Sequence, residues 1–99
     1  MKTKNFDANI SVNNLERLYN DLTGENLSIP RAQLFEDKIK KMFVRIGRER
    51  EYRILVLRYN GNTLETIGHE IGLSKGRIRQ IIDKAKKRIQ HRMIWGWNR

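Results

Sequence analysis

The C-terminal part of the sequence carries basic and polar residues at the spacing of one face of a helix. From Lys75 to Arg99 there are nine Lys and Arg residues and a single acid, Asp83. Ser74 stands just before this segment, and serine is a favourable cap for the first turn of a helix. When isoleucines at helical spacing occupy the inner side, the outward residues are Lys75, Gly76, Arg79, Gln80, Asp83 and Lys84, with Arg77 on the flank.

Side chains of these types can read duplex DNA. Arg and Lys reach O6 and N7 of guanine, and Gln pairs with adenine. Lys and Arg on the flanks of such a helix contact phosphates. The free amide groups at the helix start, presented by Ser74, also favour an anion such as phosphate. The pattern predicts that the segment 75–89 enters the major groove.

The charge distribution supports a polyanionic partner. The chain has 99 residues and a formal net charge of +10. Residues 1–37 carry four basic and six acidic side chains, whereas residues 38–99 carry seventeen basic and five acidic ones. Such asymmetry favours a nucleic acid, because each neutralised phosphate releases condensed counterions. A merely solubilising surface and a membrane surface are the alternatives, and the turn signals of the basic segment favour DNA.

The composition also excludes several classes. The chain has no cysteine, which rules out disulfides and thiolate metal sites. No apolar run approaches the length of a bilayer span, and residues 1–10 lack the apolar stretch of a signal peptide. We therefore expect a cytoplasmic protein without a membrane partner. No Gly-rich phosphate loop or Ser/His/Asp set is present, so an enzyme with a small-molecule substrate or cofactor is not indicated.

Helical spacing of apolar residues dominates the chain and predicts an all-α fold. We expect helices at 11–22, 29–46, 49–59, 63–71 and 75–89, the last running on past residue 92. The expected inward residues of the first two helices are Leu15, Leu18, Tyr19 and Leu22, then Leu34, Phe35, Ile39, Met42, Phe43 and Ile46. Those of the other three are Tyr52, Leu55, Val56 and Tyr59, then Leu64, Ile67 and Ile71, and finally Ile78, Ile81, Ile82, Ala85 and Ile89.

The last two helices are joined by a short turn, Gly72-Leu73-Ser74, and together they make a helix-turn-helix pattern. The runs at 63–68, 71–74, 77–81 and 84–85, with Ile89, resemble region 4 of the bacterial sigma-70 family. The preceding run 49–55 with 57–59 resembles the other half of the same module. In that family the helix-turn-helix reads the promoter −35 element, and the preceding half helps dock on the β-subunit flap of RNA polymerase.

The resemblance covers about residues 45–90 and implies roles for individual positions. Lys75 and Gln80 match family positions that contact −35 bases, and Arg79 and Thr63-Leu64 match positions at the DNA backbone. Taken with the outward face, we predict base contacts from Lys75, Gly76, Arg79 and Gln80. We predict phosphate contacts from Thr63, Leu64, Ser74, Arg77, Lys84 and Lys87. Partner-binding residues are predicted to be Arg50, Tyr52, Arg53, Trp95 and Trp97.

Three departures from the family pattern matter. Gly76 stands where primary sigma factors usually carry a Glu that accepts a hydrogen bond from cytosine, so the usual −35 sequence is not expected. Ile82 stands where an acidic residue is common, which extends the apolar face. Residues 1–44 show no trace of the aromatic-rich −10-binding and strand-melting region. We therefore expect a part of an initiation machine rather than a self-sufficient sigma factor.

The sequence leaves the organisation and the partners open. We divide the chain into a helical segment 1–44, a helix-turn-helix domain 45–92 and a Trp-containing tail 93–99. The leucine stripe of the first helix is interpreted as core, with a dimer or partner surface as the rival. The tail either folds back onto the core or docks on polymerase or a second subunit. His69 and His91 are isolated, so metal binding is not expected, and Glu65 and Glu70 are assigned to helix capping and salt bridging.

The favoured function is a transcription regulator that binds promoter DNA and works with bacterial RNA polymerase. One alternative is an interaction protein that binds polymerase or a sigma factor, as an inhibitor or split-sigma subunit. Another is a homodimeric helix-turn-helix repressor, which predicts a palindromic site.

Overall fold

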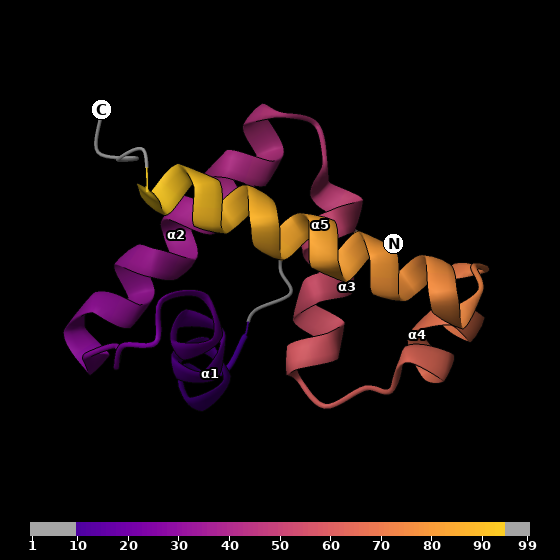
Figure 1. Ribbon diagram of the computed structural model, residues 1–99, viewed down its shortest axis with the longest axis horizontal. Helices are drawn as coiled ribbons and strands as arrows, with labels where there is room; N and C mark the ends of the chain where they lie inside the picture. Colours follow the sequence, from indigo (N-terminus) through magenta and orange to yellow (C-terminus); the bar gives the residue numbers. More distant parts are fainter. Residues whose placement is uncertain (1–9, 95–99) are drawn as a thin grey trace, which may run out of the picture.

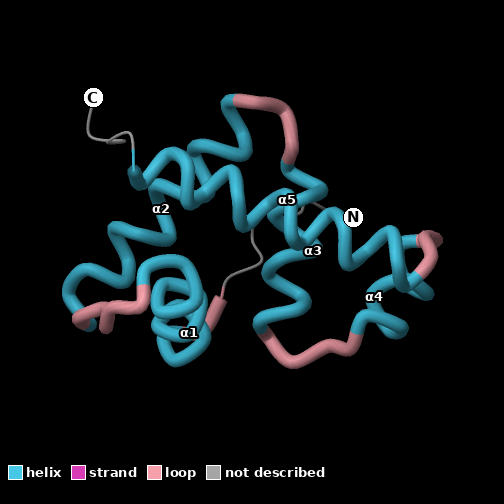
Figure 2. The backbone as a smooth tube through the Cα atoms, viewed as in Figure 1, coloured by secondary structure: helices cyan, strands magenta, loops and turns pink. Residues whose placement is uncertain are grey.

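Five helices follow one another in the described part of the chain, joined by short loops (Figures 1 and 2). The computed structural model describes residues 10–94, apart from the side chains of Val12, Ile29, Pro30 and Ile94. The helices are α1 (Val12–Thr23), α2 (Ile29–Arg45), α3 (Glu49–Tyr59), α4 (Leu64–Ile71) and α5 (Lys75–Ile94). The all-α prediction is confirmed, and the described part of the chain has no strand.

The helix ends are set by capping residues that the sequence makes visible. Ser11 and Thr63 precede α1 and α4, and each side chain accepts a hydrogen bond from a backbone amide in the first turn. Gly24 and Gly72 end the same two helices in the left-handed conformation, with φ of 77° and 87°. Ser74 Oγ accepts from the amide of Arg77 at 3.1 Å, which confirms its role as the cap of α5.

One hydrophobic core joins all five helices. The buried cluster runs from Ile10 to Ile89 and includes the α1 stripe Leu15, Leu18 and Leu22. That stripe is therefore core, as its interpretation favoured, and it leaves no leucine face on α1 for a second copy. Figure 1 shows α5 crossing the molecule from α4 at one end toward α2 at the other, with α3 behind it.

Hydrogen bonds fix α1 to the C-terminal helices. The hydroxyl of Tyr59 in α3 donates to Asp21 Oδ2 of α1 at 2.6 Å. Gln90 Nε2 of α5 donates to the carbonyl oxygen of Leu22 at 2.9 Å, at the last turn of α1. These contacts, together with the shared core, make α1 part of the same body as the helix-turn-helix.

For two residues of the α2 stripe, the prediction of burial is wrong. Leu34 is 55% exposed and Ile46 is 43% exposed. Leu34 lies one position before the buried Phe35, so the helical rotation of about 100° per residue turns it toward solvent. Ile46 caps the C-terminal end of α2, where no other helix covers it completely. In α4, Ile67 is buried as expected, whereas Leu64 and Ile71 are only half-buried.

None of the helices in the described range 10–94 combines the length and the apolar character needed to cross a membrane.

Candidate nucleic-acid interface

The turn between α4 and α5 is built around a close backbone approach. The amides of Gly72 and Leu73 both donate to the carbonyl oxygen of Gly68, at 2.7 and 2.9 Å. Gly68 is itself buried, and a Cβ placed there would lie 2.5 Å from the carbonyl oxygen of Leu73. Ile67 and Ile78 are buried on either side of the turn. The two helices are therefore held at one fixed angle, which sets the direction in which the start of α5 points.

The start of α5 presents one polar face and buries the other. The four residues predicted to contact bases are all exposed: Lys75, Gly76, Arg79 and Gln80. The inward residues are all buried, as predicted: Ile78, Ile81, Ile82, Ala85 and Ile89. The sequence therefore places the polar residues together on the outer side of a helix whose inner side is anchored in the core.

A hydrogen bond within α5 connects two of the predicted DNA contacts. Arg77 Nη1 donates to Gln80 Oε1 at 3.4 Å. The amide of Arg77 is at the same time bound by the Ser74 cap. Gln80 thus has a defined neighbour on the flank, and its amide NH₂ group keeps donors available for a base edge.

The residues predicted to contact phosphate come from the start of α4, from the turn and from α5. Thr63 is exposed at the start of α4, where its Oγ1 accepts from the Thr66 amide at 3.1 Å. The neighbouring Leu64 is half-buried. Ser74, Arg77, Lys84 and Lys87 are exposed.

Two hollows lie beside the exposed face of α5 that carries Lys75, Gly76, Arg79 and Gln80, here called the reading face. The first, here called the Tyr59 hollow, measures about 490 Å³ and includes Arg17 of α1, Arg58 of α3 and Arg79 of α5. The second, here called the α2–α5 hollow, measures about 470 Å³. Its lining consists of Met42, Arg45, Ile46, Lys84, Lys87, Arg88, His91 and Arg92. Among the residues that the structure describes, no carboxylate lines the α2–α5 hollow, which gives it a strongly positive rim around apolar side chains.

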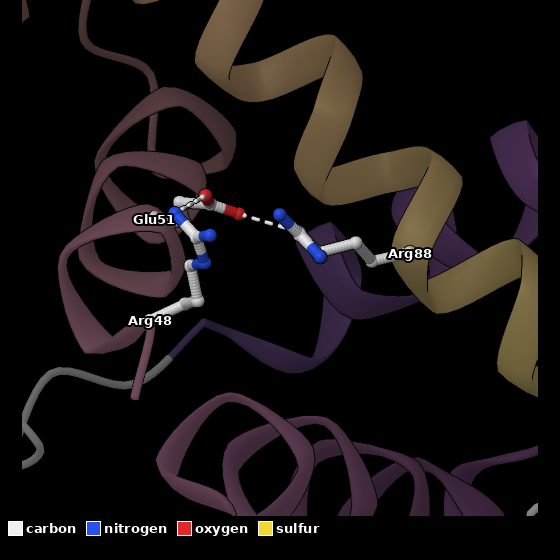
Figure 3. Close-up of polar contacts among 3 residues, drawn as sticks. All are labelled: Arg48, Glu51 and Arg88. Carbon is white, nitrogen blue, oxygen red and sulfur yellow. Dashed lines mark hydrogen bonds and ion pairs between the residues drawn. The ribbon is translucent and has the colours of Figure 1, made fainter. Parts of the chain in front are cut away.

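A buried carboxylate cross-links α3 to α5. Glu51 is only 8% exposed. Its Oε1 accepts from Arg88 Nε at 3.0 Å, and its Oε2 lies 3.6 Å from Arg48 Nη1. Figure 3 shows the carboxylate between the two guanidinium groups, one at the start of α3 and the other on α5. Sequence reasoning missed this link, because Glu51 and Arg88 are far apart in the chain and each is unremarkable as a surface charge.

The predicted partner-binding residues are divided by the structure. The prediction that Tyr52 contacts a partner at the surface is wrong. Tyr52 is 0% exposed, and its ring centroid lies 5.8 Å from that of Phe43. Burial raises the pKa of Tyr52 above its ordinary range, and the negative charge of Glu36 adds to this. Its position on the inward stripe of α3 was already predicted, and that prediction is the correct one. Trp95 and Trp97 lie outside the described residues.

The two arginines of the predicted partner set have different surroundings. Arg53 Nη2 lies 3.2 Å from Glu70 Oε2, an ion pair that ties α3 to α4 and accounts for Glu70 as predicted. Arg50 is exposed and lines a hollow with Arg48 and Arg77. Arg50 therefore lies next to a predicted phosphate contact on the flank of α5.

The described residues 10–94 contain no group of three His, Asp or Glu side chains that could hold a metal ion. His69 and His91 lie on different helices, α4 and α5.

Comparison with protein families decides what this arrangement is. Residues 48–91 match sigma-70, region 4. This part of the chain is a sigma-70 region 4 domain. No curated protein and no solved structure matches the chain.

The region 4 domain covers α3, α4 and most of α5. Region 4 domains are non-catalytic modules that bind DNA through a helix-turn-helix in transcription. Because α1 and α2 lie outside the matched residues, their packing onto the region 4 domain is a feature of this chain.

Proposed function

We propose that this protein is a sequence-specific transcription regulator that inserts the N-terminal half of α5 into the major groove of a promoter element and also contacts RNA polymerase. The observation that carries the proposal is the exposed face of α5. Lys75, Arg79 and Gln80 are exposed on a helix whose opposite side is buried, directly after a rigid turn. The major groove is wide enough to admit an α-helix, and the base edges exposed there are distinguishable.

Each residue of this face has a chemical role in the proposal. Lys75 and Arg79 donate to guanine O6 and N7, and Gln80 pairs with adenine. Gly76 offers no side chain, so the base pair opposite it is read weakly or by shape. Arg77, Lys84 and Lys87 bind phosphates on one flank. Arg50 lines a hollow with Arg77, so we assign it to the same phosphates rather than to polymerase.

Alanine substitution tests the reading face. Lys75→Ala and Gln80→Ala should weaken binding to a preferred duplex by about fivefold or more, at about 1–3 kcal/mol per lost base contact. Binding to duplexes of unrelated sequence should change far less for Gln80→Ala, which removes no charge. Arg31→Gln on α2 serves as a control, because Arg31 is exposed on a different helix. Equal affinities of Gln80→Ala and the wild type for every duplex would refute groove reading by α5.

We assign the α2 side of the α2–α5 hollow to RNA polymerase, while Lys84 and Lys87, on its α5 side, are assigned to the DNA phosphates. Its apolar residues are Met42 and Ile46, and exposed Val44 is close to Ile46 in the same helix end. The rim is basic, with Arg45 and Arg92 on opposite helices. An acidic segment of polymerase with an apolar anchor fits this combination, because the anchor covers Ile46 while carboxylates meet the rim.

Charge insertion tests the polymerase contact. Ile46→Glu should weaken binding to purified RNA polymerase at least tenfold. It should weaken duplex binding much less, through the added carboxylate in the hollow that Lys84 and Lys87 also line. Leu34→Glu is the matched control, since Leu34 is an exposed apolar residue of α2 that does not line the hollow. If both variants bind polymerase as tightly as the wild type, the assignment of this hollow is wrong.

A further inference from the structure

We propose that α1 is part of the DNA interface and that Arg17 contacts a backbone phosphate at the edge of the groove read by α5. The inference rests on the proposed function, since it extends the same DNA-binding face. It adds a contact from outside the region 4 domain, because α1 precedes the matched residues 48–91. Arg17 is the only Lys or Arg within α1.

The position of α1 is fixed by bonds to the helices that carry the reading face. Tyr59 in α3 and Gln90 in α5 both donate to α1, at 2.6 and 2.9 Å. Asn14 Nδ2, one turn before Arg17, donates to Asn60 Oδ1 at 3.4 Å. A side chain on this part of α1 therefore has a defined place relative to α5.

The Tyr59 hollow gathers cations from three helices. Arg17 of α1, Arg58 of α3, and Arg79 and Lys86 of α5 all line it. The Arg17 guanidinium carbon and the Lys86 Nζ lie 5.9 and 5.8 Å from the centroid of the Tyr59 ring. The aromatic ring attracts each of these cations, and both also line the Tyr59 hollow. An anion seated in the hollow would therefore meet positive charge from both α1 and α5.

The acidic residues of the hollow leave an excess of positive charge. Asp21 and Asp83 line it together with the four cations. Asp21 already accepts the hydrogen bond of the Tyr59 hydroxyl, which occupies one of its oxygens. Arg58 Nη1 donates to the carbonyl oxygen of Asn62 at 3.1 Å, which orients its guanidinium at the loop before α4.

The continuity of this hollow with the reading face points to DNA as the anion. Arg79 belongs to the exposed face of α5 and also lines the hollow. Leu64, at the start of α4, lines it as well. A strand whose phosphates pass Leu64 and Arg79 is therefore led into the space beside Arg17 and Lys86. An acidic protein segment is the competing occupant, and it would not need this continuity.

Salt dependence of duplex binding tests the contact. Arg17→Gln should reduce the slope of log K against log salt by about 0.9 and weaken binding on the order of fivefold at about 0.1 M salt, since one phosphate fewer is neutralised. The loss should be similar for preferred and unrelated duplexes, because a phosphate contact carries no sequence information. Arg17→Lys keeps the charge and should keep the slope.

Arg31→Gln provides the matched control, since it removes one positive charge from α2 and should leave the slope within error of the wild type. Thermal unfolding of each variant separates loss of the fold from loss of the contact. A slope for Arg17→Gln equal to that of Arg31→Gln would overturn the proposal. So would an Arg17→Gln variant that binds RNA polymerase more weakly and DNA normally. If the wild type itself shows no salt-dependent duplex binding, the proposed function fails with it; if only Gln80→Ala is impaired, the inference about α1 alone is wrong.

Discussion

Two glycines of the helix-turn-helix have opposite surroundings, although both lie within helices. A Cβ at Gly68 would lie 2.5 Å from the carbonyl oxygen of Leu73 and 3.6 Å from Cγ1 of Ile78. A Cβ at Gly76 would meet nothing within 4 Å. Gly68 is therefore required by the packing of the turn, whereas Gly76 leaves open space on the DNA-reading face.

Substitution by alanine should separate the two positions. Gly68→Ala should lower the free energy of unfolding by about 1–3 kcal/mol, because the backbone of the turn must shift to admit the methyl group. Gly76→Ala should be neutral or stabilise by up to about 1 kcal/mol, because alanine restricts the unfolded chain and favours a helix. Urea denaturation measures both. A Gly68→Ala protein as stable as the wild type would show that α4 and α5 are packed less closely than described.

Gly76→Glu should change the base preference of α5. The open space at this position admits the longer side chain, and its carboxylate can accept a hydrogen bond from cytosine N4. We expect a cytosine to become preferred at one position of the bound sequence by about 1–3 kcal/mol. Selection of bound duplexes from a random pool, with wild-type and variant proteins in parallel, measures the change. Identical selected sequences would place Gly76 away from the bases.

At the scale of the elements, polar links between helices hold them together in addition to the shared hydrophobic core. Glu51 connects the start of α3 to α5 through Arg88, and Asp21 connects α1 to α3 through Tyr59. Both links hold helices that flank the reading face. Losing either link should weaken DNA binding by changing the positions of the helices, because neither link is itself a contact with DNA.

Arg88→Gln should destabilise the fold by about 1–2 kcal/mol. Glu51 is 8% exposed, and the substitution leaves it with Arg48 as the one ion-pair partner described. The expected cost is below that of a fully buried pair, because Arg88 is about one third exposed. Arg92→Gln is the control, since Arg92 is an exposed arginine of the same helix. Equal unfolding midpoints of the two variants in urea would mean that the Glu51 link does not stabilise α3 against α5.

The Tyr59–Asp21 bond should make stability fall in alkali. Burial, and then the hydrogen bond to Asp21, raises the pKa of Tyr59 above the ordinary value of about 10. The unfolded chain therefore loses the phenolic proton first, so stability is kept below about pH 10 and decreases as pH rises above it. Tyr59→Phe should cost about 1–2 kcal/mol at neutral pH and show a shallower decrease above pH 10. Parallel alkaline profiles for variant and wild type would contradict this.

The elements were more predictable than their exposed edges. Apolar spacing located all five helices, because each buries a stripe in the same core. The reading face followed from the Ser74 cap and the isoleucine side of α5. The burial of Leu34 and Ile46 was predicted wrongly. Apolar spacing shows which side of a helix is apolar, but it does not show how much of that side the neighbouring helices cover. The links from Glu51 and Asp21 depend on tertiary contacts across 37 and 38 residues, which no local pattern encodes.

At the scale of the whole molecule, the basic charge is divided between two sides of α5. The Tyr59 hollow lies beside α1 and the α2–α5 hollow lies toward α2, and the reading face lies between them. Of the two N-terminal helices, α1 is acidic overall and α2 is basic. Each places a basic side chain beside α5: Arg17 from α1 and Arg45 from α2. In the proposed function, this arrangement lets one small protein hold DNA and polymerase at neighbouring surfaces.

Selection of bound duplexes from a random DNA pool, with and without RNA polymerase, tests the central claim most directly. The account predicts one short non-palindromic element bound through the major groove, with enrichment that depends on Lys75 and Gln80 and is strengthened by polymerase. A palindrome with half-sites about one helical turn apart would instead indicate a dimeric repressor. The absence of any enriched sequence, with or without polymerase, would contradict the claim that α5 reads DNA.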